Sequence, residues 1–169
     1  MVGPSEPAAL IREAGGQDVP VLLTLFAALA EYEQLSDRLQ ADERQLREAL
    51  FGERPAASAL IAERGGEAVG YALYFSTFSS FLTRRGLWLE DLFVLPEHRG
   101  RGIGRALLAE LAARVPDRGG RLEWAALDWN ELALGFYRGI GARAMDGWTA
   151  LRLDGEALSG LAAESADRR

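Results

Sequence analysis

The sequence of 169 residues contains no cysteine, no lysine and a single histidine, His98. Without cysteine the chain has no disulfide framework, no thiolate metal site and no cysteine nucleophile. One histidine cannot build a centre of several histidine ligands within one chain, so we predict no metal site. All 19 basic residues are arginine, for which the codon usage of a GC-rich genome is the favoured explanation.

Long apolar runs are also missing. The longest spans residues 19–30, is interrupted by Thr24, and is shorter than the roughly 20 residues that cross a bilayer. We interpret it as a core helix, and since no signal peptide is apparent we expect a cytoplasmic protein with no membrane partner. The net charge of -6 argues against nucleic-acid binding and is compatible with cationic small ligands.

Apolar periodicity and turn signals predict an alternation of strands and helices. Residues 1–8 are expected to be a flexible N-terminus, residues 9–163 a single domain, and residues 164–169 a polar tail. Hairpins mixed with crossover helices predict an α/β (α+β) fold, a mixed sheet of six to seven strands with helices on both faces. The expected strands span residues 9–14, 58–63, 67–77, 87–95, 121–127, 142–145 and 148–153, and the helices residues 19–35, 42–50, 102–115, 130–138 and 154–163.

A glycine-punctuated basic loop between a strand and a helix is the strongest functional signal. It reads Arg-Gly-Arg-Gly-Ile-Gly over residues 99–104. Alternate glycines allow backbone N–H groups to approach a ligand closely, and the following helix N-terminus attracts anions. A P-loop would need a lysine, and a dinucleotide fingerprint would need its third glycine at a different spacing. We therefore predict an anion site, most plausibly for phosphate, over the alternative of a glycine-rich turn on a basic surface.

This loop resembles the Arg/Gln-x-x-Gly-x-Gly/Ala motif of the GCN5-related N-acetyltransferase (GNAT) superfamily. The similarity extends from about residue 9 to 155. Segments that resemble the diamine (spermidine/spermine) acetyltransferase branch are AEYE at 30–33, FGERP at 51–55, VGYA at 69–72, LED at 89–91, DWN at 128–130 and FY at 136–137. LSD at 35–37 and LDWN at 127–130 are closer to its thialysine acetyltransferase relative.

The resemblance implies the GNAT fold and an acetyl-CoA-dependent N-acetyltransferase. The acceptor would be a primary amine of a small molecule, either a diamine or polyamine or a thialysine-like or lysine-like amino acid. Because there is no cysteine to carry an acyl group, we favour direct attack of the amine in a ternary complex. The implied cofactor-binding residues are Leu92, Phe93, Val94, Arg99, Gly100, Arg101, Gly102, Ile103, Gly104, Arg105, Asn130 and Tyr137.

Two residues are expected to carry the chemistry. Tyr137 is the expected general acid, since a phenol with a pKa of about 10 can protonate a departing thiolate. Glu90 is expected to face the acceptor amine and to take its proton, directly or through a water, although a structural ion pair is the alternative. For Asp91 we expect a structural role, because adjacent strand residues face opposite sides. The implied amine contacts are Tyr32, Glu33, Phe81, Glu90, Asp146 and Trp148.

The sequence departs from the polyamine enzymes in the loop after the third expected strand. There the family carries an acid and a tryptophan, and this chain has a serine and Phe81. We therefore expect an amine shorter than a long polycation. The alternatives are an acetyltransferase for protein N-termini or aminoglycosides, and a non-catalytic CoA-binding sensor or partner module. A homodimer is expected from the family.

Overall fold

The computed structural model describes residues 8–166. The chain divides into two units, the first ending at Leu127 and the second beginning at Asp128. The predicted domain of residues 9–163 crosses this division. The expected N-terminus at residues 1–7 and the end of the expected tail at residues 167–169 lie outside the described residues.

The first unit is built on a five-stranded sheet in the order β1-β2-β3-β4-β5. Its strands are β1 (Leu10–Glu13), β2 (Ser58–Arg64), β3 (Glu67–Ser79), β4 (Arg84–Val94) and β5 (Leu122–Trp124). The first four are joined by antiparallel pairs, whereas β4 and β5 are parallel. A parallel pair needs a crossover connection, and α3 (Ile103–Ala113) provides it. The mixed sheet is therefore as predicted.

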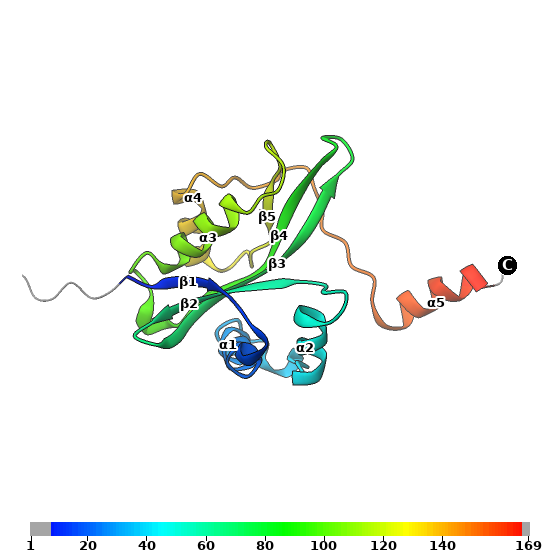
Figure 1. Cartoon of the computed structure of the whole chain (residues 1–169). Helices are drawn as coiled ribbons and strands as arrows, with labels where there is room; N and C mark the ends of the chain where they lie inside the picture. Colours follow the sequence, from blue (N-terminus) through cyan, green and yellow to red (C-terminus); the bar gives the residue numbers. More distant parts are fainter. Residues whose placement is uncertain (1–7, 167–169) are drawn as a thin grey trace, which may run out of the picture. The chain divides into compact units, whose positions relative to one another are not determined.

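Helices cover both faces of this sheet (Figure 1). The helices α1 (Val19–Tyr32) and α2 (Glu43–Phe51) lie on one face, which we call the α1/α2 face, and α3 lies on the other. Short 3-10 helices are η1 (Gly16–Asp18), η2 (Ser36–Arg38) and η3 (Pro96–His98). The core of the α1/α2 face consists of Leu22, Leu25, Leu50, Ala59, Ile61, Tyr71 and Phe93. On the other face, Leu107 and Leu111 of α3 are fully buried.

A β-bulge in β4 decides which side chains share the α1/α2 face. Leu73 pairs with Asp91 and Tyr74 pairs with Leu89, so Glu90 is an extra residue without a partner on β3. A bulge interrupts the regular alternation of side chains. Beyond it, Trp88, Gly86 and Arg84 pair with residues 75, 77 and 79, which follow Tyr71 on the same face of β3 by the period of two.

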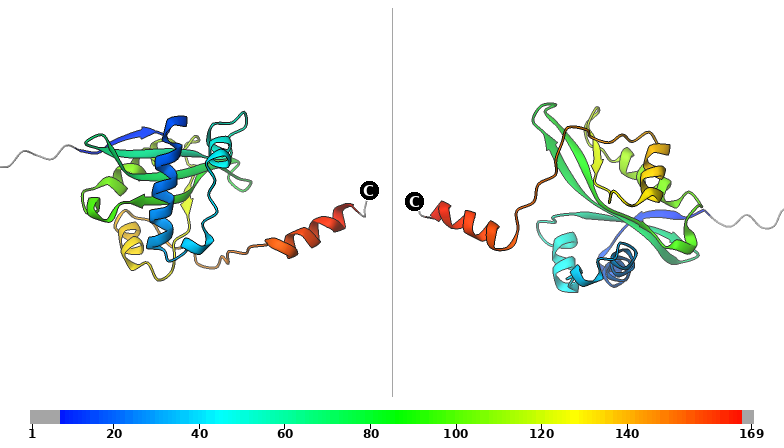
Figure 2. Two further views of the ribbon diagram at one scale, coloured as in Figure 1. Left: turned by 90° about the horizontal axis from the view of Figure 1, so that it is seen from below. Right: turned by 180° about the vertical axis from the view of Figure 1, so that it is seen from behind.

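Two features distinguish β4 near the bulge. The hairpin of β3 and β4 extends past the layer formed by α1 and α2 (Figure 2). In addition, β5 pairs with β4 only from Leu87 to Leu89, although β4 continues to Val94. The stretch of β4 from Glu90 to Val94 therefore has one edge that β5 does not pair.

The second unit contains α4 (Glu131–Gly139) and α5 (Gly155–Ala166). Asn130 caps α4, with its Oδ1 accepting from the Ala133 N–H at 3.2 Å. The strands predicted at residues 142–145 and 148–153 are absent, so the described residues hold five strands instead of six to seven. A strand needs a hydrogen-bonding partner as well as a suitable pattern, and residues 142–153 join no ladder among the described residues. The helix α5 extends into the expected polar tail.

Within residues 8–166 no helix is both long and apolar enough to span a membrane.

Candidate functional site

The glycine loop leads directly into the N-terminus of α3. Gly100 and Gly102 have φ angles of 73° and 79°, in the left-handed region that favours glycine. These φ angles, and not crowding, are the reason for glycine at both positions. A Cβ at either position would find no atom within 4 Å, so the space beside the loop is open. Gly102 is the N-cap of α3, has no side chain to cap the helix, and no acid occupies the first turn.

The first N–H groups of α3 are therefore not satisfied by a side-chain cap, in contrast to those of α2 and α4, which Asp42 and Asn130 cap. Ile103 anchors the turn because its side chain is buried, while Arg101 and Arg105 are exposed on either side of it. Positive helix-terminal N–H groups and two arginines together suit an anion. This geometry can hold the predicted phosphate.

The side chain of Arg99 is arranged differently from those of Arg101 and Arg105, because it contacts the ends of α1 and β4. Its Nε donates to the Val94 carbonyl at 2.9 Å, and its guanidinium carbon lies 4.3 Å from the centre of the Tyr32 ring. The Phe93 ring is 5.6 Å away. Cation–π contacts at these distances are attractive, so Arg99 links the end of α1 to the end of β4 and fixes the start of the loop.

The unpaired edge of β4 presents backbone groups beside this loop. The Leu95 N–H donates to the Val69 carbonyl on β3 at 2.9 Å. Because successive N–H groups of a strand point to opposite edges, the Phe93 N–H is directed toward β3, and the N–H groups of Leu92 and Val94 are directed toward the open edge. The Phe93 side chain is buried in the core of the α1/α2 face.

Three carboxyl groups lie together near the bulge. Glu33 follows α1 directly, and its charge and that of Glu90 both act on Asp91. Trp88 Nε1 donates to Glu90 Oε2 at 3.0 Å, which orients that carboxylate. The bulge thus directs Glu90 to the α1/α2 face on which Trp88 and Asp91 lie. The expectation that Glu90 and Asp91 face opposite sides was wrong, because it assumed unbroken alternation.

The carboxyl of Asp91 is the most perturbed member of this group. Burial and the neighbouring charges of Glu90 and Glu33 raise the pKa of Asp91 to about 6, against the opposing effect of a hydrogen bond from Tyr71. Tyr71 Oη donates to Asp91 Oδ2 at 3.2 Å, and burial raises the pKa of Tyr71 above its ordinary value. Burial likewise raises the pKa of Glu33.

The remaining predicted residues lie at the hairpin and in the second unit. Phe81 is 97% exposed at the tip of the β3–β4 hairpin. Tyr137 is half-buried on α4, with its ring 5.4 Å from that of Phe136. Asp146 and Trp148 lie in the irregular segment after α4, and both are exposed.

Sequence reasoning missed two residues of the first unit that affect the site. Trp88 was not considered, although a tryptophan two residues before an acid in a strand is placed to donate to it. For Asp91 a structural role was expected; its raised pKa comes from burial and from the charges of Glu90 and Glu33, and Glu33 is 58 positions away in the chain, so no sequence pattern could pair the two. Among residues 8–166 there is no group of three or more His, Cys, Asp or Glu residues placed to hold a metal ion.

Comparison with known proteins identifies relatives over most of the chain. The acetyltransferase (GNAT) family model matches residues 23–142. The thialysine N-epsilon-acetyltransferase of Sus scrofa is 40% identical over 165 residues, which cover 90% of this chain and 96% of the relative. The L-ornithine N5-acetyltransferase of Arabidopsis thaliana is 38% identical over 93 residues, which cover 54% of this chain and 41% of the relative. Among solved structures, an integron cassette protein from the mobile metagenome of V. cholerae has a TM-score of 0.77 at 28% identity, covering 92% of this chain and 98% of that one.

Proposed function

Because the chain belongs to the acetyltransferase (GNAT) family, we propose that it is an acetyl-CoA-dependent enzyme that acetylates a primary amine of a small molecule. The acceptor would be a lysine-like amino acid or a diamine. The observation that carries this proposal is the acidic group of Glu33, Glu90 and Asp91, which adjoins the unpaired edge of β4 just ahead of the glycine loop.

Acetyl-CoA would supply a thioester-activated acetyl group and a pyrophosphate by which it can be held. The N–H groups at the start of α3 and the arginines at positions 101 and 105 are suited to the pyrophosphate. The open space beside Gly100 and Gly102 fits a close approach of phosphate to backbone. Asn130 and Tyr137 of the second unit are proposed as further contacts.

The acidic group would bind the acceptor as its ammonium ion. Acylation needs the free amine, since a protonated amine has no lone pair for attack. Glu90, oriented by Trp88, is proposed to accept that proton directly or through a water. Ionised Asp91 and Glu33 would hold the cation beside it, while Tyr32 and Phe93 form an apolar wall nearby, their rings 6.5 Å apart.

The remaining steps would be carried by the strand edge and by Tyr137. An N–H of Leu92 or Val94 can donate to the acetyl carbonyl oxygen as negative charge develops on it. The amine nitrogen then forms the new C–N bond as the C–S bond breaks, and the Tyr137 hydroxyl gives its proton to the departing sulfur. The nitrogen loses two protons in all. Glu90 receives the first, which frees the lone pair, and the second leaves the nitrogen as the C–N bond forms and restores the Tyr137 hydroxyl, directly or through a water.

The proposal is tested by a thiol-release assay with acetyl-CoA and a panel of acceptors. The panel contains lysine, thialysine, ornithine, diamines, polyamines and aminoglycosides. We expect thiol release with the lysine-like amino acids or the short diamines, at rates above those for spermine and aminoglycosides. Tight acetyl-CoA binding without release with any member of the panel would favour the non-catalytic sensor, and a preference for aminoglycosides would redirect the acceptor assignment.

A further inference from the structure

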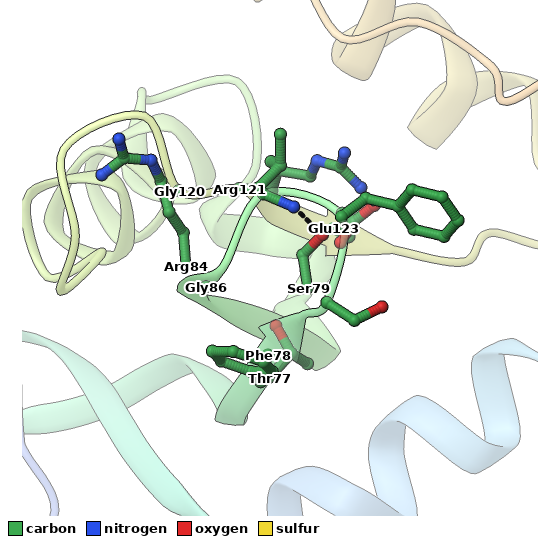
Figure 3. A pocket seen from close by; sticks show the side chains of 11 residues that line it. Thr77, Phe78, Ser79, Arg84, Gly86, Gly120, Arg121 and Glu123 are labelled. Atoms are coloured by element: carbon green, nitrogen blue, oxygen red, sulfur yellow. Dashed lines mark hydrogen bonds and ion pairs between the residues drawn. The ribbon is translucent and has the colours of Figure 1, made fainter.

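A second polar site lies on the α1/α2 face, beyond the bulge and away from the glycine loop. It is a pocket of about 240 Å³ between the tip of the β3–β4 hairpin and the start of β5. Figure 3 shows Arg121, which directly precedes β5, and Glu123 of β5 on one side of it and Arg84 extending from β4 on the other. Thr77, Ser79 and Phe81 also line it.

Gly86 forms the floor of this pocket. A Cβ at position 86 would lie 2.6 Å from the Arg121 carbonyl oxygen and 3.1 Å from the Thr77 hydroxyl oxygen. Any larger residue would therefore push against the backbone that leads into β5 and reduce the cavity. Glycine at this position lets β4 and β5 approach closely while keeping the pocket open.

The charges in the pocket are opposite to those of the acidic group. The charged residues that line the pocket are two arginines and one glutamate, although the whole chain carries a net charge of -6. Arg121 Nη1 lies 3.7 Å from Glu123 Oε1, which is longer than a hydrogen bond. The ion pair therefore leaves hydrogen-bonding capacity on both groups, a donor fork on Arg121 and acceptors on Glu123.

Trp88 lies on β4 between the pocket and the acidic group. Trp88 pairs with Glu123 across β4 and β5 and with Phe75 across β3 and β4. Glu123 lines the pocket and lies opposite Trp88. Glu90 follows Trp88 by two residues, so it lies about 7 Å farther along the strand than Glu123. This distance is comparable with an extended lysine-like side chain, and Phe75 and Trp88 are apolar surfaces for its methylene groups.

We infer that this pocket binds the α-carboxylate and α-ammonium groups of an amino-acid acceptor while the side-chain amine reaches Glu90. Arg121 would donate to the carboxylate, and Glu123 would accept from the α-ammonium. Arg84 adds positive charge at the rim. The inference rests on the proposed acetyltransferase function and deepens it by selecting an amino acid over a diamine, whose second ammonium would meet Arg121.

Removing the carboxylate from the acceptor tests the inference with the unaltered protein. The values of kcat/KM would be measured at saturating acetyl-CoA for lysine and thialysine, for their amides, and for the two diamines that correspond to them without the carboxylate. A charge-assisted hydrogen bond predicts a loss of roughly ten- to a hundredfold for the diamines and the amides.

The variant Arg121→Gln should reduce kcat/KM for the amino acids by a similar factor and leave the diamines unchanged or improved. Arg118→Gln is the matched control, since it removes the same charge from an exposed position that does not line the pocket. Thermal melts of both variants would verify that they are folded.

The possible failures are distinct. If the unaltered enzyme uses the diamines as well as the amino acids, or if Arg121→Gln slows both kinds of acceptor equally, the pocket does not bind the carboxylate, and the acetyltransferase proposal stands. If no acceptor releases thiol, both proposals are wrong.

Discussion

The carboxyl of Asp91 links the chemistry of the site to the stability of the fold. Its pKa is raised from 3.8 to about 6, so between these pH values the folded chain holds a proton that the unfolded chain has lost. The free energy of unfolding therefore falls as pH rises through this window. Above pH 6 the ionised carboxylate is destabilising in its buried position, by on the order of 3 kcal/mol.

The variant Asp91→Asn should remove this pH dependence. Asparagine is neutral at every pH and can still accept a hydrogen bond from Tyr71, so we expect the variant to gain stability relative to wild type as pH rises from 4 to 7.5. Urea unfolding at several pH values would measure the difference. Subtracting the wild-type curve cancels other carboxyls such as Asp18, whose pKa is lowered by Arg12. Parallel curves for the two proteins would contradict the raised pKa.

Tyr137 offers a direct test of the proposed acid. In Tyr137→Phe the ring is retained and the proton donor is lost, so kcat should fall by roughly a hundredfold or more. The KM for acetyl-CoA and the melting temperature should change little, because the packing against Phe136 is preserved. Unchanged thiol release with a good amine at every pH would show that another group protonates the sulfur.

At the scale of elements, the start of α3 depends on one glycine conformation. Gly102→Ala places a side chain at a φ of 79°, where an L-residue costs roughly 1–2 kcal/mol. No neighbour would be struck by the added Cβ, so any effect comes from the backbone. We expect a lower melting temperature and a raised KM for acetyl-CoA as the loop relaxes.

Gly135→Ala is the control for this prediction. Gly135 lies within α4 with no atom within 4 Å of a built Cβ, and alanine favours a helix interior by about 1 kcal/mol over glycine. The same substitution should therefore stabilise at one position and destabilise at the other. If Gly102→Ala keeps the wild-type melting temperature and KM, the left-handed conformation at residue 102 is not needed for cofactor binding.

Most elements of the first unit could be predicted from local signals. The Gly65-Gly66 turn set the β2–β3 hairpin, and Asp42 marked the start of α2 because it caps that helix through the Gln45 N–H. The bulge at Glu90 could not be predicted, since it is a property of the pairing between two strands. The strands expected at residues 142–153 failed for the same reason, because alternation does not reveal whether a partner strand exists.

At the scale of the whole molecule, the second unit exposes apolar side chains that an interface with another chain would bury. Trp148 is 78% exposed and Leu151 is 91% exposed, and burying one such side chain contributes roughly 1.5–3 kcal/mol. We propose that a second copy of the chain covers them in a homodimer. Light scattering should then give twice the chain mass, and Leu151→Glu should shift the mass toward the single chain.

The neighbouring exposed residue Arg152 provides the control for the homodimer. Arg152→Gln changes charge in the same segment without altering apolar area, so the mass should remain that of two chains. A single-chain mass for the unaltered protein at every concentration would contradict the proposal.

The extra residue in β4 also bears on the phase of the strand. Trp88, Gly86 and Arg84 share the α1/α2 face with Asp91 because one extra residue interrupts the alternation. A deletion of Glu90 would restore the regular alternation and keep the other pairs of β3 and β4, so Trp88 and Gly86 would stay on the α1/α2 face and Leu87 and Leu89 in the core. The bulge therefore adds a carboxylate to the strand without changing the faces of its neighbours, and a deletion of Glu90 is expected to remove the acidic side chain while it preserves the hydrophobic core.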